Sequence, residues 1–328
     1  MLSLSQHEGA AILCPFENEP SFRYDRRMTW SVAALYRFVA LADLPALQAE
    51  ARAACEMQGA CGTLLIAPEG VNGTLAAPEA AMPALVDALD ALFGVRQGEL
   101  KFSAASKKPF VRLKVRLKRE IITMRAPEAD PTQRAGTYVA PKDWNAVIAD
   151  PEVLVVDTRN RYETLVGSFQ GAVDPGIDTF TEFKDFVAEK LDPAKHKKIA
   201  MFCTGGIRCE KASSFLLAHG FEDVVHLKGG ILQYLEDVPA AESLWQGDCY
   251  VFDSRVAVGH GLAETGWDRC FGCGAPLTPE DVAAPSYEKG VSCRHCAETL
   301  TPERADAFRT RQAQIVASGR STKADPLP

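Results

Sequence analysis

Residues 199–212 read Ile-Ala-Met-Phe-Cys-Thr-Gly-Gly-Ile-Arg-Cys-Glu-Lys-Ala. The apolar run at the start predicts a buried strand, and the residues from about Cys209 onward predict a helix. Cys203 then stands at the carboxyl end of the strand, where open α/β sheets bind their ligands. The order of strand, glycine-containing turn and helix predicts an active-site loop. This loop consists of Cys203, Thr204, Gly205, Gly206, Ile207 and Arg208.

The composition of the loop favours a reactive cysteine. Gly205 and Gly206 allow a sharp turn that points backbone amides inward, and the following helix adds the positive end of its dipole. With the charge of Arg208, these groups stabilise a thiolate on Cys203, so we predict both residues as catalytic. The alternative is a structural cysteine before a glycine turn, which the flanking strand and helix disfavour. Cys209 is either a resolving thiol for Cys203 or, as we favour, a buried residue at the start of the helix.

The region around the loop, residues 138–240, alternates apolar strands with helices. Such alternation predicts a parallel sheet with helices on both faces. The expected strands are 153–156, 199–202 and 224–227, and the expected helices are 179–190 and 210–219. Residues 126–137, which contain Pro, Asp and Gly, predict a linker before this unit.

Residues 28–125 show the element order βαββαβ, which is typical of a ferredoxin-like (acylphosphatase-like) fold. In chain order we expect strand 32–39, helix 44–57, strands 63–67 and 73–77, helix 78–93 and a long strand 110–122. The turn of a hairpin is predicted at residues 71–73, Val-Asn-Gly, between apolar runs. Residues 70–73 have neither the spacing nor the lysine of a phosphate-binding loop. Residues 1–27 predict an irregular extension.

The last strand of this unit carries positive charge on one face. Residues 110–120 read Phe-Val-Arg-Leu-Lys-Val-Arg-Leu-Lys-Arg-Glu, so apolar and cationic residues alternate. The cations form what we call the basic stripe: Arg112, Lys114, Arg116 and Lys118. In a chain of net charge −7, the stripe predicts either a local contact with a polyanion or a solvated edge strand whose charges discourage aggregation.

Residues 241–328 predict a small Cys-rich module with a charged tail. Two Cys-x-x-Cys pairs are separated by 19 residues, which is the spacing of zinc-ribbon knuckles. The four cysteines are Cys270, Cys273, Cys293 and Cys296. Cys249 and His295 are alternative ligands, and reduced thiols or disulfides are alternatives to zinc. A closed four-thiolate site would be structural, because it leaves no open position for catalysis.

Length and composition indicate a multidomain protein of the cytoplasm. A chain of 328 residues exceeds one ordinary core, and 47% hydrophobic with 24% charged residues is typical of globular proteins. No stretch approaches the roughly 18 apolar residues of a membrane span, and no signal peptide is visible. We therefore expect no membrane contact. The pattern of the chain does not indicate an oligomeric state.

Several motifs resemble those of rhodanese domains. A loop of six residues, 203–208, has the size that rhodaneses use, whereas cysteine phosphatases have one residue more. Residues 155–159, Val-Val-Asp-Thr-Arg, resemble the opening strand and its Asp-x-Arg turn. Residues 167–172 and 226–230 resemble the next motif and the final Gly-Gly turn, with Ser168 where many rhodaneses have His.

The two charged residues of the Asp-x-Arg turn, Asp157 and Arg159, each have a functional and a structural interpretation. Arg159 follows a strand directly, so it is either a possible substrate contact or a member of an ion pair on the surface. For Asp157 we favour the capping of a turn.

A narrower resemblance extends over nearly the whole chain. Stretches in all three units are similar to the rhodanese-type tRNA uridine hydroxylases: 69–74, 157–160, 174–180, 203–212 and 245–252. The resemblance implies oxygen-dependent 5-hydroxylation of the wobble uridine, tRNA as the partner, and an essential loop cysteine, here Cys203. It also favours the tRNA backbone as the polyanion that meets the basic stripe.

Two other functions stay open at this point. One is a sulfurtransferase that carries a persulfide on Cys203; the other is a tRNA- or protein-binding module that retains the fold without catalysis. The sequence shows no flavin, nicotinamide or nucleotide fingerprint. The six histidines are scattered, without the pattern of a two-His-one-carboxylate iron site. The resemblance implies molecular oxygen as the co-substrate, and the paired cysteines indicate a possible structural zinc.

Overall fold

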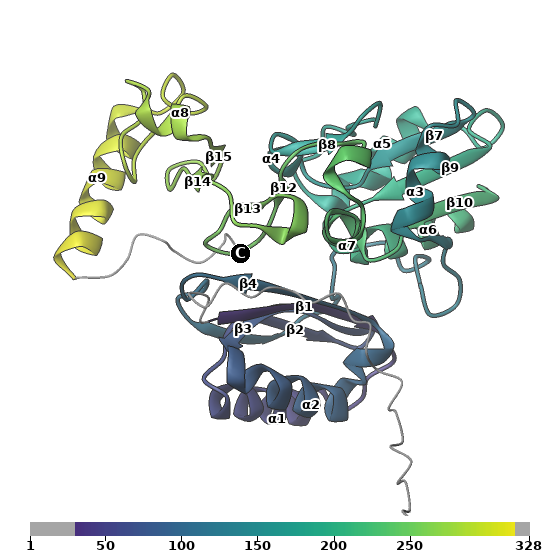
Figure 1. Cartoon of the computed structure of the whole chain (residues 1–328), viewed down its shortest axis with the longest axis horizontal. Helices are drawn as coiled ribbons and strands as arrows, with labels where there is room; N and C mark the ends of the chain where they lie inside the picture. The colour runs from purple at the N-terminus through teal and green to yellow at the C-terminus, as the bar shows by residue number, and fades with distance from the viewer. Residues whose placement is uncertain (1–29, 319–328) are drawn as a thin grey trace, which may run out of the picture.

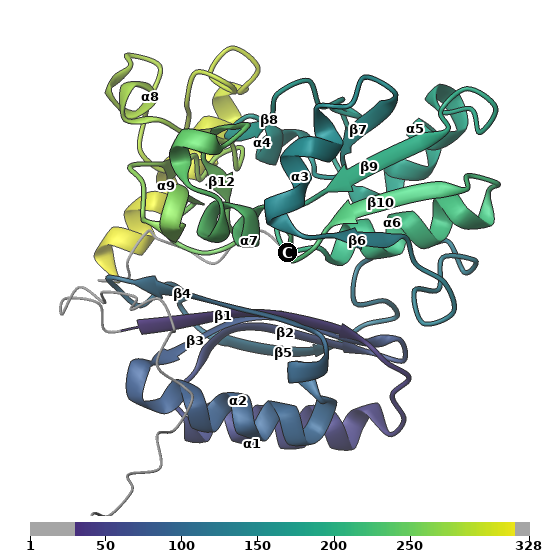
Figure 2. The same ribbon diagram turned by 45° about the vertical axis from the view of Figure 1, so that its right-hand side comes forward.

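The computed structural model describes residues 30–318 of the chain. The predicted extension at residues 1–27 and the last residues of the charged tail lie outside this range. Figure 1 shows an N-terminal sheet backed by helices, a second sheet flanked by helices, and a smaller C-terminal part. In Figure 2 the second and third parts lie over the face of the first sheet that its helices leave open.

The N-terminal part is a five-stranded sheet of order β4-β1-β3-β2-β5 with helices on one face. Its elements are β1 (Trp30–Phe38), α1 (Leu44–Met57), β2 (Cys61–Ala67), β3 (Gly70–Pro78), α2 (Met82–Phe93), β4 (Glu99–Ala105) and β5 (Leu113–Leu117). β5 is parallel to β2, and the other neighbours are antiparallel. Alternate strand residues, among them Leu64, Leu75 and Val115, pack with the helices into one core. The predicted fold class of this unit is confirmed.

The strand that closes this fold is a different one from the strand predicted. β4 pairs with β1 and completes the ferredoxin-like sheet; its few apolar residues, Leu100 and Phe102, gave no clear pattern. The predicted long strand 110–122 was wrong in length, because only β5 forms, as an extra edge beside β2. Beyond β5 the apolar residues of the alternation are not buried throughout: Val111 is 57% exposed.

The β2–β3 hairpin exists, but its turn lies at residues 68–69 and not at the predicted 71–73. Asn72 and Gly73 lie inside β3. The Asn72 amide donates to a backbone carbonyl downstream of β5 at 2.9 Å, and a Cβ at Gly73 would lie 2.5 Å from the carbonyl oxygen of Thr63. The Asn-Gly pair therefore serves close strand packing instead of a turn, and the predicted turn was wrong.

The second part contains a four-stranded parallel sheet of order β6-β10-β9-β7, with a core on each face. Its strands are β6 (Thr137–Val139), β7 (Val153–Asp157), β9 (Lys198–Phe202) and β10 (Asp223–Leu227). Its helices are α3 (Pro141–Ile148), α4 (Arg161–Thr164), α5 (Phe183–Lys190), α6 (Ile207–Ala218) and α7 (Gly230–Asp237). The predicted strands and helices are confirmed within a few residues, and the elements that were not predicted are short.

The C-terminal residues divide into two regions. β11 (Trp245–Gly247) pairs with β8 (Gly167–Phe169) of the second part, and residues as far as Leu262 share its core. The Cys-rich region follows. The remaining elements are β12 (Cys249–Tyr250), β13 (Ala257–Val258), β14 (Asp268–Arg269), β15 (Pro276–Leu277), α8 (Pro279–Ala283) and α9 (Pro302–Ala317). Between residues 30 and 318, no helix has the length and apolar character needed to cross a membrane.

The segment between β5 and β6 forms no helix or strand, as expected for the predicted linker, but it is not an exposed tether. Met124, Ala126 and Ala129 are buried in a core that includes Ile177 and Phe180 of the second part. Burial of these side chains restrains the first sheet relative to the second part.

Candidate active site

Cys203 follows β9 directly, at the carboxyl end of the parallel sheet, and its loop leads into α6. The Cys203 side chain is fully buried. The amide of Gly206 donates to Cys203 Sγ at 3.1 Å, as the loop sequence predicts. A Cβ at Gly205 would meet no atom within 4 Å. Open space therefore lies beside the loop at Gly205.

Two glycines allow neighbouring elements to approach the loop closely. Gly206 has φ 105°, and a Cβ there would lie 2.8 Å from the phenol oxygen of Tyr36 on β1. Gly230 has φ +66°, and a Cβ there would lie 2.5 Å from the carbonyl oxygen of Cys203. The amide of Ile231 donates to that carbonyl at 2.9 Å. Residues without a Cβ are thus required on two sides of the loop.

The surroundings of the Cys203 sulfur favour the thiolate. Burial alone would raise the pKa of Cys203, but the S–H group of Cys209, the charge of Arg208 and backbone amides outweigh burial and lower it to about 6. Burial and the nearby Cys203 raise the pKa of Cys209 well above that of a free thiol. The Cys209 sulfur also lies 3.3 Å from the hydroxyl of Thr158. Near pH 7, Cys203 is a thiolate and Cys209 a protonated donor.

Arg208 acts as one half of a buried ion pair. Its guanidinium donates to both carboxylate oxygens of Glu163, at 2.5 and 2.7 Å. Burial would raise the pKa of Glu163, but Arg208 lowers it. Glu163 also accepts a hydrogen bond from the hydroxyl of Thr204 at 3.2 Å. The pair fixes both ends of the loop, and direct participation of Arg208 in catalysis stays a prediction.

Asp157 and Arg159, at the end of β7, form a second ion pair with no exposed surface. The Arg159 guanidinium donates to both oxygens of Asp157, at 2.6 and 2.9 Å, and to the carbonyl of Gly167 at 2.6 Å. It lies 5.1 Å from the ring of Trp245. The hydroxyl of Ser168 donates to Asp157 at 3.1 Å. Because Arg159 is enclosed and joins β7, β8 and β11, we no longer expect it to touch a substrate.

The first sheet is joined to α6 next to the loop. Lys211 of α6 is buried, and its ammonium group contacts Glu69 at 2.8 Å and Glu120 at 2.7 Å. Glu210 accepts a hydrogen bond from the hydroxyl of Tyr36 at 2.9 Å. Both carboxylates that hold Lys211 come from the N-terminal part. The active-site loop therefore lies at the junction of the first two parts.

The basic stripe lies on and beside the edge strand β5. Lys114 pairs with Thr63 of β2, and Arg116 pairs with Leu65 of the same strand. Leu65 pairs in turn with Asn72 of β3, and Asn72 pairs with Tyr36 of β1. Residues in register share a face of the sheet. Lys114 and Arg116 therefore point to the face that carries Tyr36 and meets the active-site loop. Arg112, Arg116 and Lys118 are exposed and Lys114 is half-buried; contact with RNA stays a prediction.

The four paired cysteines come together in the C-terminal part, with all sulfur atoms within 4.8 Å of one another. Three of the Sγ–Sγ distances are 3.7, 3.9 and 3.9 Å. Thiolates about 2.3 Å from a tetrahedral zinc ion would lie about 3.8 Å apart. The cluster consists of Cys270, Cys273, Cys293 and Cys296. Cys249 instead belongs to the core of the second part, where burial raises its pKa to about 12.

Three residues at the loop have no clear signal in the sequence. Glu163 lies in the one-turn helix α4, too short for a periodic pattern, and only the need of a buried Arg208 for a partner points to it. Tyr36 occupies an alternating strand position and reads as a core residue. Glu210 lies in the first turn of α6, where an acidic residue is accounted for by the helix dipole.

The fold and the loop define a class of protein: a rhodanese-type domain with a cysteine loop, joined to an acylphosphatase-like domain. Residues 30–121 match the family model described as UPF0176 acylphosphatase like domain, and residues 140–237 match the Rhodanese-like domain model. Within this class, the chain belongs to the tRNA uridine(34) hydroxylase family.

Membership rests on two relatives that match along most of their own length and most of this chain. The tRNA uridine(34) hydroxylase of Deinococcus radiodurans is 57% identical over 283 residues, which cover 86% of this chain and 94% of that protein. The protein of the same name from Mesorhizobium japonicum is 52% identical over 284 residues, covering 87% of this chain and 92% of that one. A solved rhodanese-related protein from Thermoplasma volcanium is 27% identical, with a TM-score of 0.26, and covers 31% of this chain and 93% of its own.

Proposed function

We propose that this chain hydroxylates C5 of the wobble uridine, nucleotide 34 of tRNA, using molecular oxygen and the thiolate of Cys203. The observation that carries the proposal is a loop whose Gly206 amide contacts Cys203 Sγ and whose groups favour the thiolate, in a chain 57% identical to a tRNA uridine(34) hydroxylase. Because its substrate would be tRNA, we place its activity in the cytoplasm. A sulfurtransferase is the rival function, since the same thiolate can carry a persulfide.

The reaction begins with addition of the thiolate to the base. Uracil is electrophilic at C6, because its C4 carbonyl withdraws electrons through the ring double bond. When Cys203 Sγ bonds to C6, an electron pair moves towards C5 and O4, and C5 becomes nucleophilic. The inward-pointing loop amides and the charge of Arg208 supply positive potential beside the developing anion.

The nucleophilic C5 then captures oxygen. Loss of the C5 proton and expulsion of the thiolate restore the ring and free Cys203. One oxygen atom of O₂ stays on C5, and the other leaves as water, which takes two electrons and two protons from an external two-electron donor such as a small thiol. In the competing order, oxygen is first held on the Cys203 sulfur and is then delivered to the base.

The target base must leave its stack to reach the sulfur. A uridine in an anticodon loop can be splayed out, unlike a base in a duplex. Cys203 is fully buried, and the open space beside Gly205 is the side of the loop from which a base can approach. We propose that the base enters there.

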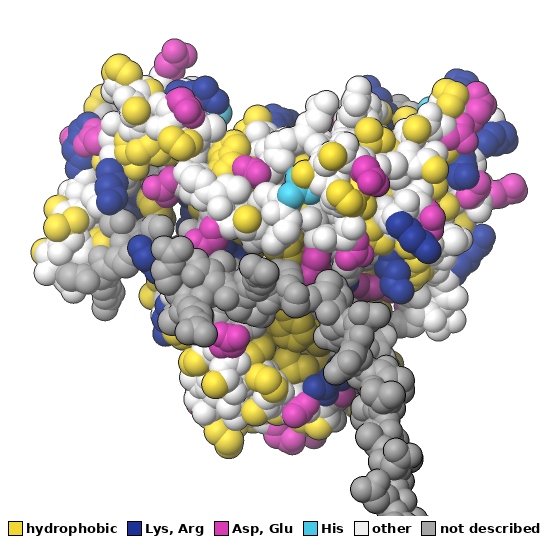
Figure 3. All heavy atoms as spheres, viewed as in Figure 1, with side chains coloured by type: hydrophobic (Ala, Val, Ile, Leu, Met, Phe, Trp, Pro, Cys, Tyr) yellow, Lys and Arg dark blue, Asp and Glu magenta, His cyan; other side chains and the backbone are white. Residues whose placement is uncertain are grey.

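The basic stripe supports phosphate binding by the N-terminal part. It lies at the edge of the face that meets the active-site loop. On the side of the molecule in Figure 3, Lys and Arg side chains are scattered among Asp and Glu and form no single patch. Because the net charge of the chain is −7, a local stripe and not a general positive field has to guide the tRNA backbone.

We also propose a structural zinc ion bound by the four-cysteine cluster. The sulfur separations fit a tetrahedral thiolate site, as worked out above, and thiolates are ligands that zinc prefers. The ion would stabilise a region whose core consists of little more than the cysteines, Leu277, Val282 and Tyr287.

Nucleoside mass spectrometry tests the function. Cells that lack the protein should lose 5-hydroxyuridine from tRNA and regain it with the wild-type chain but not with Cys203→Ser. Cys55→Ala, which changes a buried cysteine of α1, is the control and should restore the modification. A thiolated nucleoside would favour the sulfurtransferase, and unchanged tRNA would favour a binding module.

A 5-fluorouridine tRNA separates the two orders of chemistry. Fluorine at C5 cannot leave as a proton does, so an adduct at C6 should persist as a covalent protein–RNA complex through denaturation. Wild-type protein should form this complex and Cys203→Ser should not. Active enzyme that forms no complex but accumulates a Cys203 sulfenate without tRNA would support oxidation of the sulfur first.

A further inference from the structure

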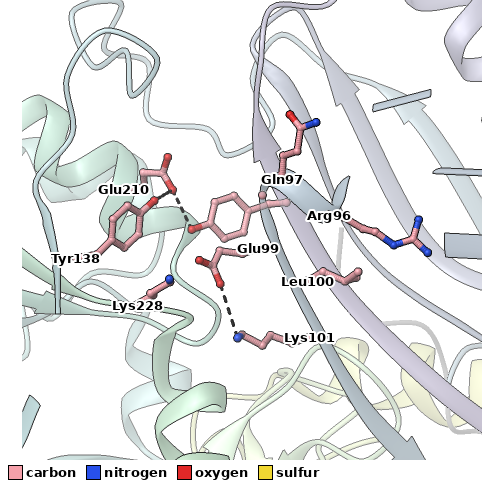
Figure 4. A pocket seen from close by; sticks show the side chains of 10 residues that line it. Arg96, Gln97, Glu99, Leu100, Lys101, Tyr138, Glu210 and Lys228 are labelled. Atoms are coloured by element: carbon pink, nitrogen blue, oxygen red, sulfur yellow. Dashed lines mark hydrogen bonds and ion pairs between the residues drawn. The ribbon is translucent and has the colours of Figure 1, made fainter. Parts of the chain in front are cut away.

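A pocket of about 540 Å³ opens between the first two parts, beside the active-site loop. One wall comes from β1, from β4 and from the turn before β4; the other comes from β6, from the first turn of α6 and from the residue after β10. Figure 4 shows Tyr138 beside Glu210, with Lys228 and Lys101 in the same pocket. The hydroxyls of Tyr36 and Tyr138 both donate to the Glu210 carboxylate. Neither the proposed chemistry at Cys203 nor the proposed phosphate contact of the basic stripe involves this pocket.

One wall of the pocket is continuous with the catalytic loop. The Glu210 amide donates to the carbonyl of Gly206 at 3.0 Å, and the Gly206 amide contacts Cys203 Sγ at 3.1 Å. The Tyr36 phenol packs against the same glycine. A group bound in the pocket therefore lies next to the residues that surround the nucleophile.

Tyr138 supplies a fixed and accessible aromatic ring. Its side chain is 42% exposed, yet its hydroxyl donates to Glu210 at 2.6 Å. The ring centroid lies 4.3 Å from that of the buried His226. Support by His226 and the hydrogen bond to Glu210 hold the ring in one orientation, so stacking on it costs little conformational entropy. Bases of single-stranded RNA bind on such rings.

Two ammonium groups lie beside this ring. Lys228 is exposed and makes no ion pair with another residue of the described range. Lys101 pairs weakly with Glu99, because the ammonium nitrogen and the carboxylate oxygen are 3.8 Å apart. The Lys101 ammonium group also lies close to Gly229, the neighbour of Lys228, since a Cβ at Gly229 would be 3.0 Å from Lys101 Nζ. Glu99 offsets part of the charge of Lys101, and the Glu210 carboxylate is held by two tyrosine hydroxyls. The two lysines can therefore accept a singly charged phosphodiester and no larger charge. Arg96 also borders the pocket but points away in Figure 4.

We propose that this pocket binds a nucleotide adjacent to the target uridine in the anticodon loop. Its base would stack on Tyr138, and its phosphodiester would lie between Lys101 and Lys228. Stacking there would hold the neighbouring base out of the anticodon stack and leave the uridine free to turn towards Cys203. This inference rests on the proposed function, because it takes the anticodon loop as the substrate.

The test uses anticodon stem-loop RNAs with 2-aminopurine on either side of U34, a base whose fluorescence falls when it stacks on an aromatic ring. Wild-type protein should quench one of the two probes, and Tyr138→Ala should abolish the quench and raise Kd roughly tenfold or more. Lys228→Glu should reduce the slope of log Kd against log salt by about 1. Lys195→Glu is the charge-matched control, exposed at the opposite end of β9, and should change neither.

The outcomes separate the pocket from the function. If the wild type hydroxylates U34 while Tyr138→Ala keeps both quench and affinity, the pocket assignment is wrong and the function stands. A quench that depends on Tyr138 without formation of 5-hydroxyuridine contradicts the function and supports the pocket. Absence of RNA binding by the wild type contradicts both. Because Lys228 is exposed, its variant tests the phosphate contact even if Tyr138→Ala does not fold.

Discussion

Replacing Cys209 by alanine should raise the pKa of the Cys203 thiol, whereas replacing it by serine should leave that pKa low. Burial alone would raise the pKa of Cys203, and the hydrogen bond from Cys209 is the largest of the contributions that bring it down to about 6. Serine keeps a donor at this position, and alanine removes it. The two variants therefore differ in the hydrogen bond and little in size.

The size of the effect follows from the energy of such a bond. A hydrogen bond to a charged group contributes about 1.5–3 kcal/mol, and about 1.4 kcal/mol corresponds to one pKa unit. In Cys209→Ala the pKa of Cys203 should thus rise by about one to two units. The thiolate fraction at pH 7 would fall from about nine tenths to between about one half and one tenth. Hydroxylation should fall with it and recover as the pH is raised.

The assay is alkylation of Cys203 by iodoacetamide over a range of pH, with the modified peptide quantified by mass spectrometry. The midpoint of the rate profile is compared, not the absolute rate, because the sulfur is buried. Wild type and Cys209→Ser should share a midpoint near 6, and Cys209→Ala should titrate at higher pH. An unchanged midpoint in Cys209→Ala would refute the argument that this thiol stabilises the thiolate.

Three further predictions concern parts of the molecule away from the sulfur. Reversing Arg112, Lys114 and Arg116 to Glu should weaken tRNA binding and reduce its salt dependence, while reversal of Lys190, Lys195 and Lys197 should not; equal affinities would place the RNA elsewhere. Elemental analysis should find about one zinc per chain, lost in Cys270→Ser; a well-folded chain without metal would rule out the zinc site. Lys211→Met should cost about 1–3 kcal/mol, less than a fully buried pair because its carboxylate partners are 25% and 21% exposed. Urea unfolding measures this cost, and stability equal to the wild type would show that the pairs do not hold the two parts together.

The parts of the fold that the sequence predicts best are those with a long periodic pattern or a distinctive loop. α1 begins and ends at the predicted residues, because its apolar positions repeat over several turns. The loop after β9 is where the apolar strand and two glycines place it. The errors have local causes: the Asn72-Gly73 pair has the composition of a turn but lies in a strand, where a backbone carbonyl binds the Asn72 amide.

The sequence predicts the active-site loop but not the residues from other elements that contact it. Cys203 and Arg208 are visible in one stretch of sequence, but Glu163 reaches Arg208 from 45 residues away. Tyr36 reaches Glu210 across 174 residues and between two parts of the chain. The first contact depends on how α4 packs beside the loop, and the second depends on how the first sheet packs on α6. No local pattern encodes either arrangement. The pocket could not be predicted for the same reason, because its walls come from two separately folded parts of the chain.

The central claim is tested most directly by incubating purified protein with tRNA and dithiothreitol, as the two-electron reductant, under ¹⁸O₂ and analysing the nucleosides by mass spectrometry. Exchange of oxygen for sulfur and addition of one oxygen change the nominal mass equally, so the isotope is needed to separate them. The account predicts 5-hydroxyuridine at nucleotide 34 that carries one ¹⁸O atom with the wild-type chain and is absent with Cys203→Ser. A product that contains sulfur and no ¹⁸O, or labelled 5-hydroxyuridine formed equally by Cys203→Ser, would contradict it.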